Sequence, residues 1–87
     1  MRAQRDRSVD LGDTRVQLSP LEFGVLHTLA AHPAVPVSRA DLLREVWGTS
    51  YDGGSNTVDV VIRSLRKKLG PVADRVETVR GVGYRLR

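Results

Sequence analysis

The segment NTVDVVIRSLRKKLG, residues 56–70, constrains the fold more than any other stretch, because its spacing fits a helix with one buried side. A helix turns about 100° per residue, so side chains three or four positions apart share a face. One face is apolar, with Val58, Ile62, Leu65 and Leu69 in line and Val61 beside them. The opposite line holds Asn56, Val60, Arg63 and Lys67. Gly70 favours a left-handed cap and Pro71 cannot continue the helix, so the sequence predicts a helix that ends at Gly70 with a buried back and an exposed front.

Two more helices are expected before this one. Ser19, three residues before Glu22, forms a capping box with a proline between them, which predicts a helix over residues 20–32. A second cap at Ser38 predicts a short helix with an apolar face, and Gly48 ends it. The sequence therefore predicts three helices in a row, with a turn-rich loop before the third.

Strands are expected at both ends of the chain. SVDLGDTRVQL alternates apolar and polar residues, which predicts two short strands joined by a tight turn at Gly12 and Asp13. VETV and GYRL predict a C-terminal hairpin whose apolar face offers Val76, Tyr84 or Leu86 to the helices. A strand pair, three helices and a hairpin indicate an α+β fold, a winged helix-turn-helix with a longer loop than the plain motif has.

The glycines of Gly81-Val82-Gly83 raise the alternative of a nucleotide-binding loop. Such a loop follows a strand and opens a helix whose N-terminus faces phosphate, but strand-like residues lie on both sides of these glycines. They therefore predict a hairpin turn, made with positive-φ or closely approaching backbone, that projects Arg80 away from the core.

Length and composition favour one small soluble domain. Eighty-seven residues suffice for a single core, divided into N-terminal strands (1–18), a three-helix part (19–70) and a wing (71–87). No apolar run reaches the length of a membrane span, and the first residues lack the pattern of a signal peptide, so a cytoplasmic protein is expected. With no cysteine there is no disulfide or thiolate zinc site, and no cofactor is expected.

Positive charge is concentrated in the last third of the chain. The net charge of +4 divides into +1 for residues 1–18, −2 for 19–55 and +5 for 56–87. A solvated basic face would explain the charge alone. The front of the third helix is more specific, because it combines an acid, Asp59, expected to pair with Arg63, with an arginine and an exposed valine. These groups suit cytosine N4, guanine and a thymine methyl in the major groove of DNA.

The segments SPLEF, LLREVWG, LRKKLG and TVRGVGYRL together resemble the effector domain of the OmpR/PhoB family of response regulators, over about Val9 to Arg87. The resemblance implies a winged helix-turn-helix that binds promoter DNA as head-to-tail dimers on direct repeats. It also implies an N-terminal receiver domain, which a cognate sensor kinase phosphorylates, outside this chain. The family's N-terminal sheet has four strands and only two are evident here, so either the sequence begins inside that sheet or residues 1–7 form part of it.

The resemblance also assigns roles to individual residues. Base readout falls to Asp59, Val60, Arg63 and Ser64 in the major groove and to Arg80 in the minor groove. Phosphate contacts fall to Trp47, Asn56, Thr57, Val61, Arg66, Lys67, Thr78 and Tyr84. The loop over residues 48–55, with Thr49, Ser50, Tyr51 and Asp52, corresponds to a segment that touches RNA polymerase in some members. Asn56, Val61 and Ser64 depart from the residues common in the family, which predicts a different operator or a lower affinity.

Two other functions compete with DNA recognition. An enzyme is disfavoured, because His27 and His32 have neither metal-binding spacing nor clustered carboxylates around them. A winged helix used only for protein contacts stays open, since the fold alone does not decide between the two uses. RNA binding is a weaker option, because the basic segment lacks an aromatic stacking platform.

Overall fold

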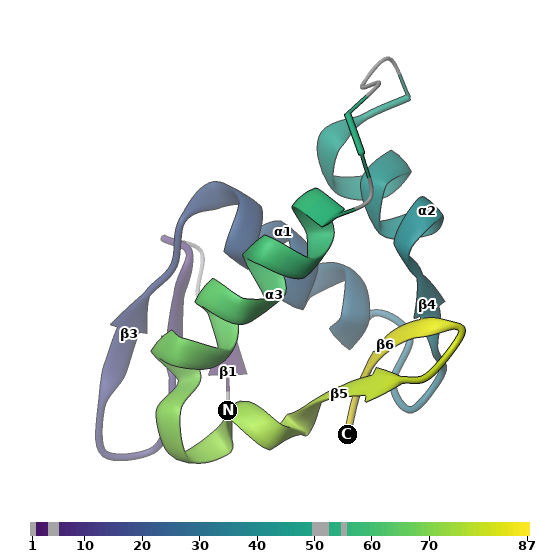
Figure 1. Cartoon of the computed structure of the whole chain (residues 1–87). Coiled ribbons are helices and arrows are strands. Elements are labelled where there is room, and N and C mark those ends of the chain that lie inside the picture. The colour runs from purple at the N-terminus through teal and green to yellow at the C-terminus, as the bar shows by residue number, and fades with distance from the viewer. Residues whose placement is uncertain (1, 4–5, 50–52, 55) are drawn as a thin grey trace.

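The computed structural model describes residues 2–3, 6–49, 53–54 and 56–87 (Figure 1). Its helices and strands follow the predicted order, with short additions. The elements are β1 (Arg2–Ala3), β2 (Ser8–Asp10), β3 (Arg15–Gln17), α1 (Pro20–Ala30), β4 (Val37–Ser38), α2 (Arg39–Leu42), the π-helical turn η1 (Leu43–Trp47), α3 (Asn56–Leu69), the 3-10 turn η2 (Gly70–Arg75), β5 (Val76–Val79) and β6 (Gly83–Leu86). The predicted α+β winged helix-turn-helix is confirmed.

The predicted capping box begins α1. The Ser19 hydroxyl accepts from the backbone N–H of Glu22 at 3.2 Å, and the Glu22 carboxylate accepts from the backbone N–H of Ser19 at 2.8 Å. Pro20 occupies the first turn, where its missing N–H costs nothing. The helix ends at Ala30, slightly before the predicted His32.

The second helix is less regular than predicted. Ser38 caps α2 as expected, since its hydroxyl accepts from the Asp41 backbone N–H at 3.0 Å. After Leu42 the chain widens into η1, and the N–H of Gly48 reaches back five residues to the carbonyl of Leu43 at 3.1 Å. The prediction of one regular helix up to Trp47 was therefore wrong: α2 ends at Leu42, and a wider π-helical turn continues the segment to Trp47.

The N-terminal sheet has three antiparallel strands within the described residues, in the order β1-β2-β3. The two strands predicted around Gly12 are present as β2 and β3. Arg2 and Ala3 pair with Asp10 and Val9 as β1. Of the two explanations for the short sheet, the structure supports the one in which residues before Ser8 form part of it.

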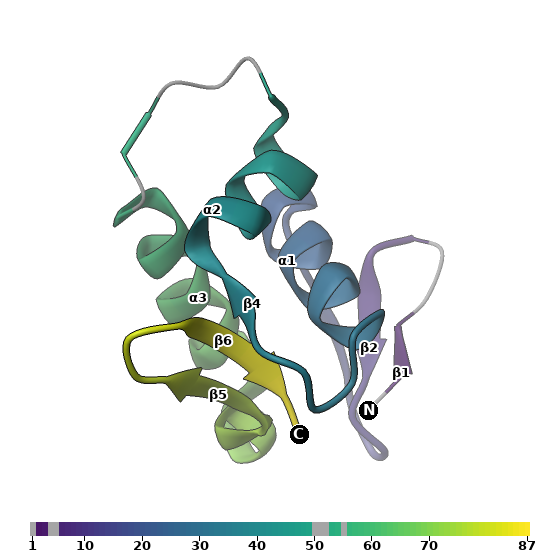
Figure 2. The ribbon, with the colours of Figure 1, turned by 90° about the vertical axis from the view of Figure 1, so that its right-hand side faces the viewer.

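The wing is a three-stranded sheet in the order β4-β6-β5. The β5–β6 hairpin is confirmed, but β4, which pairs Val37 with Tyr84, has no counterpart in the sequence prediction. Figure 2 shows β4 running beside β6 and leading directly into α2. The strands are so close that a Cβ on Gly83 would lie 2.0 Å from the carbonyl oxygen of Val37, whereas Gly81 supplies the turn with a φ of 77°. The two glycines thus provide both expected properties, close approach and positive φ.

One core holds α3 against α1 and both sheets. Val58, Ile62, Leu65 and Leu69, the predicted apolar line, are at most 1% exposed. The other buried apolar side chains are Val9, Leu18, Val25, Leu26, Leu29, Val37, Leu42, Val61, Val76 and Tyr84. Gly70 ends α3 with a φ of 55°, as predicted, and the chain continues through η2 to the wing. In Figure 1 α3 crosses the front of the molecule, with α2 and the wing on its right.

Candidate nucleic-acid interface

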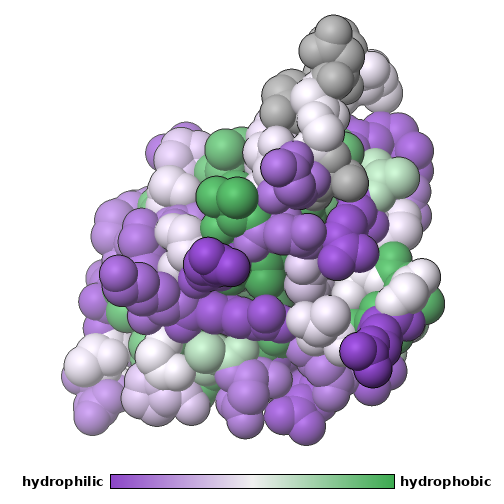
Figure 3. Space-filling model, in the orientation of Figure 1, coloured by the Kyte–Doolittle hydropathy of each residue, from purple (hydrophilic) through white to green (hydrophobic). Residues whose placement is uncertain are grey.

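The front of α3 is exposed along its length, as the sequence predicts. Four residues on this face are exposed: Asn56, Val60, Arg63 and Lys67. The exposed fraction of Val60 is 66%. Figure 3 shows that this face of the molecule is mostly hydrophilic, with small hydrophobic patches between the polar residues. A single exposed apolar side chain is ordinary at a protein surface, and at this place on α3 its chemistry suits a thymine methyl.

The shoulder of α3 that faces α1 is tied to Glu22. The Ser64 hydroxyl donates to Oε2 of Glu22, and the Lys68 ammonium donates to Oε1 at 2.7 Å. Glu22 is 3% exposed; burial would raise its pKa, but the hydrogen bonds from Lys68, Ser64 and the Ser19 N–H lower it to about 2. Because the Ser64 hydroxyl gives its proton to Glu22, it could read a base only as an acceptor, and base readout by Ser64 stays a prediction.

The opposite shoulder meets α2 and the wing through Asp59. Its Oδ1 accepts a hydrogen bond from the Tyr84 hydroxyl and another from Arg39 Nε at 2.8 Å. The bond from Tyr84 holds the pKa of Asp59 below its usual value, against the effect of burial and with support from Arg39. The expected pair with Arg63 is therefore wrong: the partner is Arg39, twenty residues earlier in the chain.

Tyr84 is a packing residue in this structure. It is 4% exposed and its hydroxyl is engaged by Asp59, so the expected phosphate contact is corrected. Burial, followed by the contact with the Asp59 carboxylate, raises the pKa of Tyr84. The guanidinium carbons of Arg39 and Arg66 lie 5.3 and 5.7 Å from the centre of its ring. Two cations on one aromatic ring stabilise the junction of α2, α3 and β6.

Arg66 ties α3 to β5. It donates to the carbonyl oxygen of Val76 through Nε at 3.0 Å and Nη2 at 2.7 Å, and to Thr78 Oγ1 at 2.8 Å. The guanidinium of Arg66 thus holds the wing through Nε and Nη2, and its expected phosphate contact stays a prediction. Thr78 is exposed, and its hydroxyl accepts from Arg66 while keeping its own proton to donate. The Thr78 hydroxyl thus keeps one donor for a group outside the protein.

The tip of the wing presents Arg80. The N–H of Val82 donates to the carbonyl of Val79 at 3.0 Å and closes the turn, with Gly81 at positive φ. Arg80 is exposed, and within the described part of the chain it forms no ion pair or side-chain hydrogen bond. Val82 beside it keeps 49% of its surface. The placement agrees with the predicted outward projection of Arg80.

The remaining predicted phosphate residues divide into two groups. Val61 is 9% exposed, belongs to the core and has no polar side-chain atom, so its expected phosphate contact is corrected. Trp47 is half-buried and packs against the core, as predicted for its ring. Thr57 is half-buried at the start of α3, close to the exposed Asn56.

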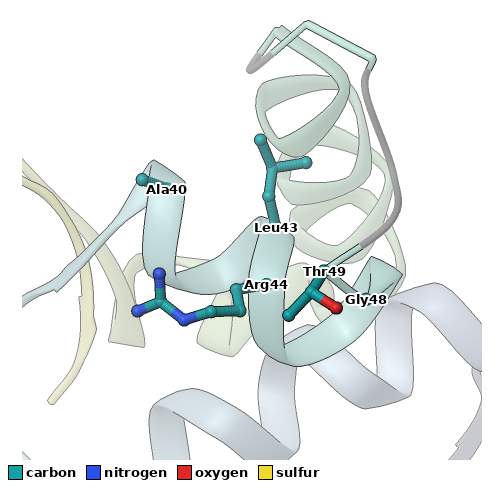
Figure 4. Close-up of a pocket in the computed structure, with 5 residues that line it drawn as sticks. All are labelled: Ala40, Leu43, Arg44, Gly48 and Thr49. Atoms are coloured by element: carbon teal, nitrogen blue, oxygen red, sulfur yellow. The ribbon is translucent and has the colours of Figure 1, made fainter.

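The segment expected to touch RNA polymerase is described only in part. Thr49 is exposed, whereas Ser50, Tyr51 and Asp52 lie outside the described residues. A hollow of about 260 Å³ is lined by Ala40, Leu43, Arg44, Gly48 and Thr49 (Figure 4). Arg44 is paired there with Asp41, so this hollow offers no unpaired charge to a small ligand.

The described part of the chain holds neither a cluster of metal-ligand side chains nor a helix that could span a membrane. Within residues 2–3, 6–49, 53–54 and 56–87, no three His, Cys, Asp or Glu side chains gather as metal ligands would. Over the same ranges no helix has the length and apolar character needed to cross a bilayer. His27 stacks on Phe23 with ring centres 6.0 Å apart, and both histidines are exposed.

Sequence reasoning missed Arg39. No local spacing connects it to Asp59, because they meet only after β4 pairs with β6 and turns the start of α2 toward α3. The available signal was indirect: Asp59 is the single acid of α3 among several cations, and such an acid needs a partner.

Known proteins are similar to this chain in sequence and in fold. The family described as "Transcriptional regulatory protein, C terminal" matches residues 13–86. The phosphate regulon transcriptional regulatory protein PhoB of Escherichia coli (strain K12) is 49% identical over 77 residues, which cover 86% of this chain and 34% of PhoB. The chain thus spans about a third of that relative's length.

Two solved structures have the same fold. The DNA-binding domain of Bacillus subtilis CssR superposes with a TM-score of 0.85 at 36% identity, covering 99% of this chain and 98% of that one. The DNA-binding domain of Klebsiella pneumoniae RstA, solved in complex with an RstA box, superposes with a TM-score of 0.78 at 41% identity, covering 92% and 82% of the two chains.

Proposed function

Because the chain belongs to the family of C-terminal domains of transcriptional regulatory proteins, we propose that it binds double-stranded promoter DNA sequence-specifically as the effector domain of a two-component response regulator. The family comprises DNA-binding regulators and is not an enzyme class. The observation that carries the proposal is the front of α3, where Val60 and Arg63 are exposed on a helix whose back and both shoulders are fixed.

We assign base readout in the major groove to three residues of α3. Val60 meets a thymine methyl, Arg63 forks onto guanine O6 and N7, and Asp59 accepts from a base amino group. Arg80 enters the adjacent minor groove from the wing. The Asp59 carboxylate would be repelled by phosphates, so among the groups of a duplex it suits the amino groups on base edges.

Phosphate contacts supply most of the affinity and fix the register of α3 in the groove. We assign them to Lys67, Asn56 and Thr57 on α3, to Thr78 on the wing and to the indole N–H of Trp47. Their exposure or half-exposure supports this assignment. Without Val61 and Tyr84, which are buried, fewer contacts remain than the resemblance implies, which predicts a modest affinity for a single domain.

The wider setting is also part of the proposal. A protein in which this chain is the DNA-binding part is expected to act in the cytoplasm, with a receiver domain before it and a cognate sensor kinase. On direct repeats two copies are expected to bind head to tail, and Thr49 with its neighbours is expected to face RNA polymerase. PhoB, of which the chain spans only a part, supports such a setting by its name as a regulon's transcriptional regulator.

Selection of bound duplexes from a random pool tests the proposal. We expect enrichment of one half-site and, if two copies bind, a fixed repeat spacing. Affinity for the selected duplex should fall steeply with salt, at about 0.9 log units per log unit of salt for each neutralised phosphate. A pool that shows no enrichment even at low salt would leave the protein-contact module as the better reading.

A further inference from the structure

We propose that Arg39 is a positioning residue for base selection: with Tyr84 it anchors Oδ1 of Asp59, so that Oδ2 is held ready to accept from the N4 amino group of a cytosine. This inference rests on the proposed binding of α3 in the major groove. It assigns a role in specificity to Arg39, a residue of α2 that lies outside both α3 and the wing.

The geometry of the carboxylate supports this role. Both donors, the Tyr84 hydroxyl and Arg39 Nε, converge on Oδ1. Within the described residues Oδ2 takes part in no hydrogen bond, and the Asp59 side chain keeps 42% of its exposure. A carboxylate has about four acceptor positions, so two remain for a base after Oδ1 is anchored.

Anchoring matters because a free aspartate on this face has several rotamers. A side chain that is already held in one geometry loses less freedom when the base arrives, so more of the hydrogen-bond energy goes into discrimination. The anchors come from two elements, Arg39 from α2 and Tyr84 from β6, and Tyr84 is itself only 4% exposed. Both anchors on Oδ1 are therefore present in the free protein and do not depend on contact with DNA.

Charge favours the same conclusion. An unpaired aspartate among phosphates would be repelled, whereas the guanidinium of Arg39 balances its charge. The side chain of Arg39 is 36% exposed, so the pair stands at the protein surface where α3 would meet a duplex. What remains for the groove is a neutral pair in which Oδ2 of Asp59 has no hydrogen-bond partner among the described residues.

The position that Asp59 reads is identified first. Pools selected with the wild-type chain and with Asp59→Ala should differ at one base pair, where the wild type prefers cytosine by roughly tenfold, as a well-placed hydrogen bond to a base edge does. Four duplexes that differ only at that pair then serve as probes.

The test compares Arg39→Gln with Arg44→Gln, which removes the same charge from an exposed arginine that pairs with Asp41. We expect Arg39→Gln to reduce the cytosine preference at that pair by roughly three- to tenfold and to keep the preferences elsewhere. Arg39→Lys should restore part of it, Tyr84→Phe should lower it too, and Arg44→Gln should leave it unchanged. In the Asp59→Ala background, Arg39→Gln should have no further effect on selectivity.

Other outcomes separate the two proposals. A wild-type chain with no sequence preference would overturn the proposed function and this inference together. Two outcomes with a selective wild type would overturn the inference alone. In the first, Asp59→Ala changes no position. In the second, Arg39→Gln weakens all duplexes equally and lowers the salt slope by about one, which would make Arg39 a phosphate contact. Circular dichroism shows whether Arg39→Gln folds. If it does not, the cytosine preference of Tyr84→Phe and Arg39→Lys decides the question.

Discussion

Glu22 holds a charge in a nearly closed position, so its ionisation is coupled to folding. Three donors outweigh the effect of burial and lower its pKa from 4.5 to about 2. A carboxylate with a lower pKa in the folded state stabilises the fold above its unfolded pKa, and this contribution is lost as the pH falls through the folded value. The relevant window therefore runs from about pH 4.5 down to about pH 2.

We predict that Glu22→Gln lowers the free energy of unfolding at pH 7 by on the order of 3 kcal/mol, and that the difference from the wild type shrinks toward pH 2. Urea unfolding over a series of pH values measures this. Asp74→Asn is the control, because the side chain of Asp74 is 80% exposed and its contact with Arg87 is 3.6 Å long. A constant difference across the window would mean that the charge of Glu22 is not what stabilises the contact.

Two neighbouring cations on the front of α3 should behave differently. We predict that Arg63→Ala costs about 1–3 kcal/mol on the selected duplex and relaxes the preference at one base pair, because it removes a base contact. Lys67→Ala should weaken all duplexes alike and lower the salt slope by about one, because it removes a phosphate contact. Titration of selected and scrambled duplexes at several salt concentrations measures both effects. Equal losses on both duplexes for Arg63→Ala would contradict its role.

For single residues, the sequence predicted which side chains of α3 are exposed, but it did not predict which residues they form hydrogen bonds with. Helical spacing alone was sufficient to place Val60, Arg63 and Lys67 on the outside, because direction on a helix is a local property. The partners of Ser64, Tyr84 and Asp59 lie between 20 and 42 residues away, so they depend on how the elements pack. Three residues assigned to DNA by resemblance also hold the protein together, Arg66 and Tyr84 at the wing and Ser64 at α1.

Among the elements, the wing depends on two glycines for different reasons. We predict that Gly83→Ala destabilises the fold by roughly 2–4 kcal/mol, because the added Cβ would lie 2.0 Å from the carbonyl oxygen of Val37 and force β4 away from β6. Gly81→Ala should cost only about 1–2 kcal/mol, since its φ of 77° strains an alanine while nothing lies within 4 Å. Thermal unfolding compares the two, and similar losses would mean that β4 can move aside without cost.

The elements that the sequence predicted are those with local signals. Capping serines, a proline in the first turn and a left-handed glycine each act within a few residues, so α1, the start of α2 and the end of α3 were foreseeable. The strand β4 is only two residues long and exists because β6 lies beside it. The π-helical turn η1 likewise has no marker in LREVW, and close packing of Val46 on Gly24 shows that α1 shapes that segment.

Across the whole molecule, α3 and the wing are joined by side chains as well as by the core. Arg66 joins them with three hydrogen bonds, two to the carbonyl oxygen of Val76 and one to the Thr78 hydroxyl. We predict that Arg66→Met destabilises the fold by about 1.5–3 kcal/mol and speeds amide hydrogen exchange in β5 of the free protein. Lys67→Met removes the same charge from an exposed neighbour and should do neither. Unchanged exchange in β5 would show that the hairpin is held without Arg66.

These links give the molecule a property that no single contact has. With α3 fixed to β5 by Arg66 and to β6 through Asp59 and Tyr84, the helix and the tip of the wing stand at a set separation. A duplex must then match that separation in the width of its grooves, and groove width varies with sequence even at base pairs that no side chain touches. Operators are thus expected to be distinguished by their shape: replacing a stiff A-tract beneath Arg80 with a wider-grooved sequence should weaken binding although every contacted base is kept.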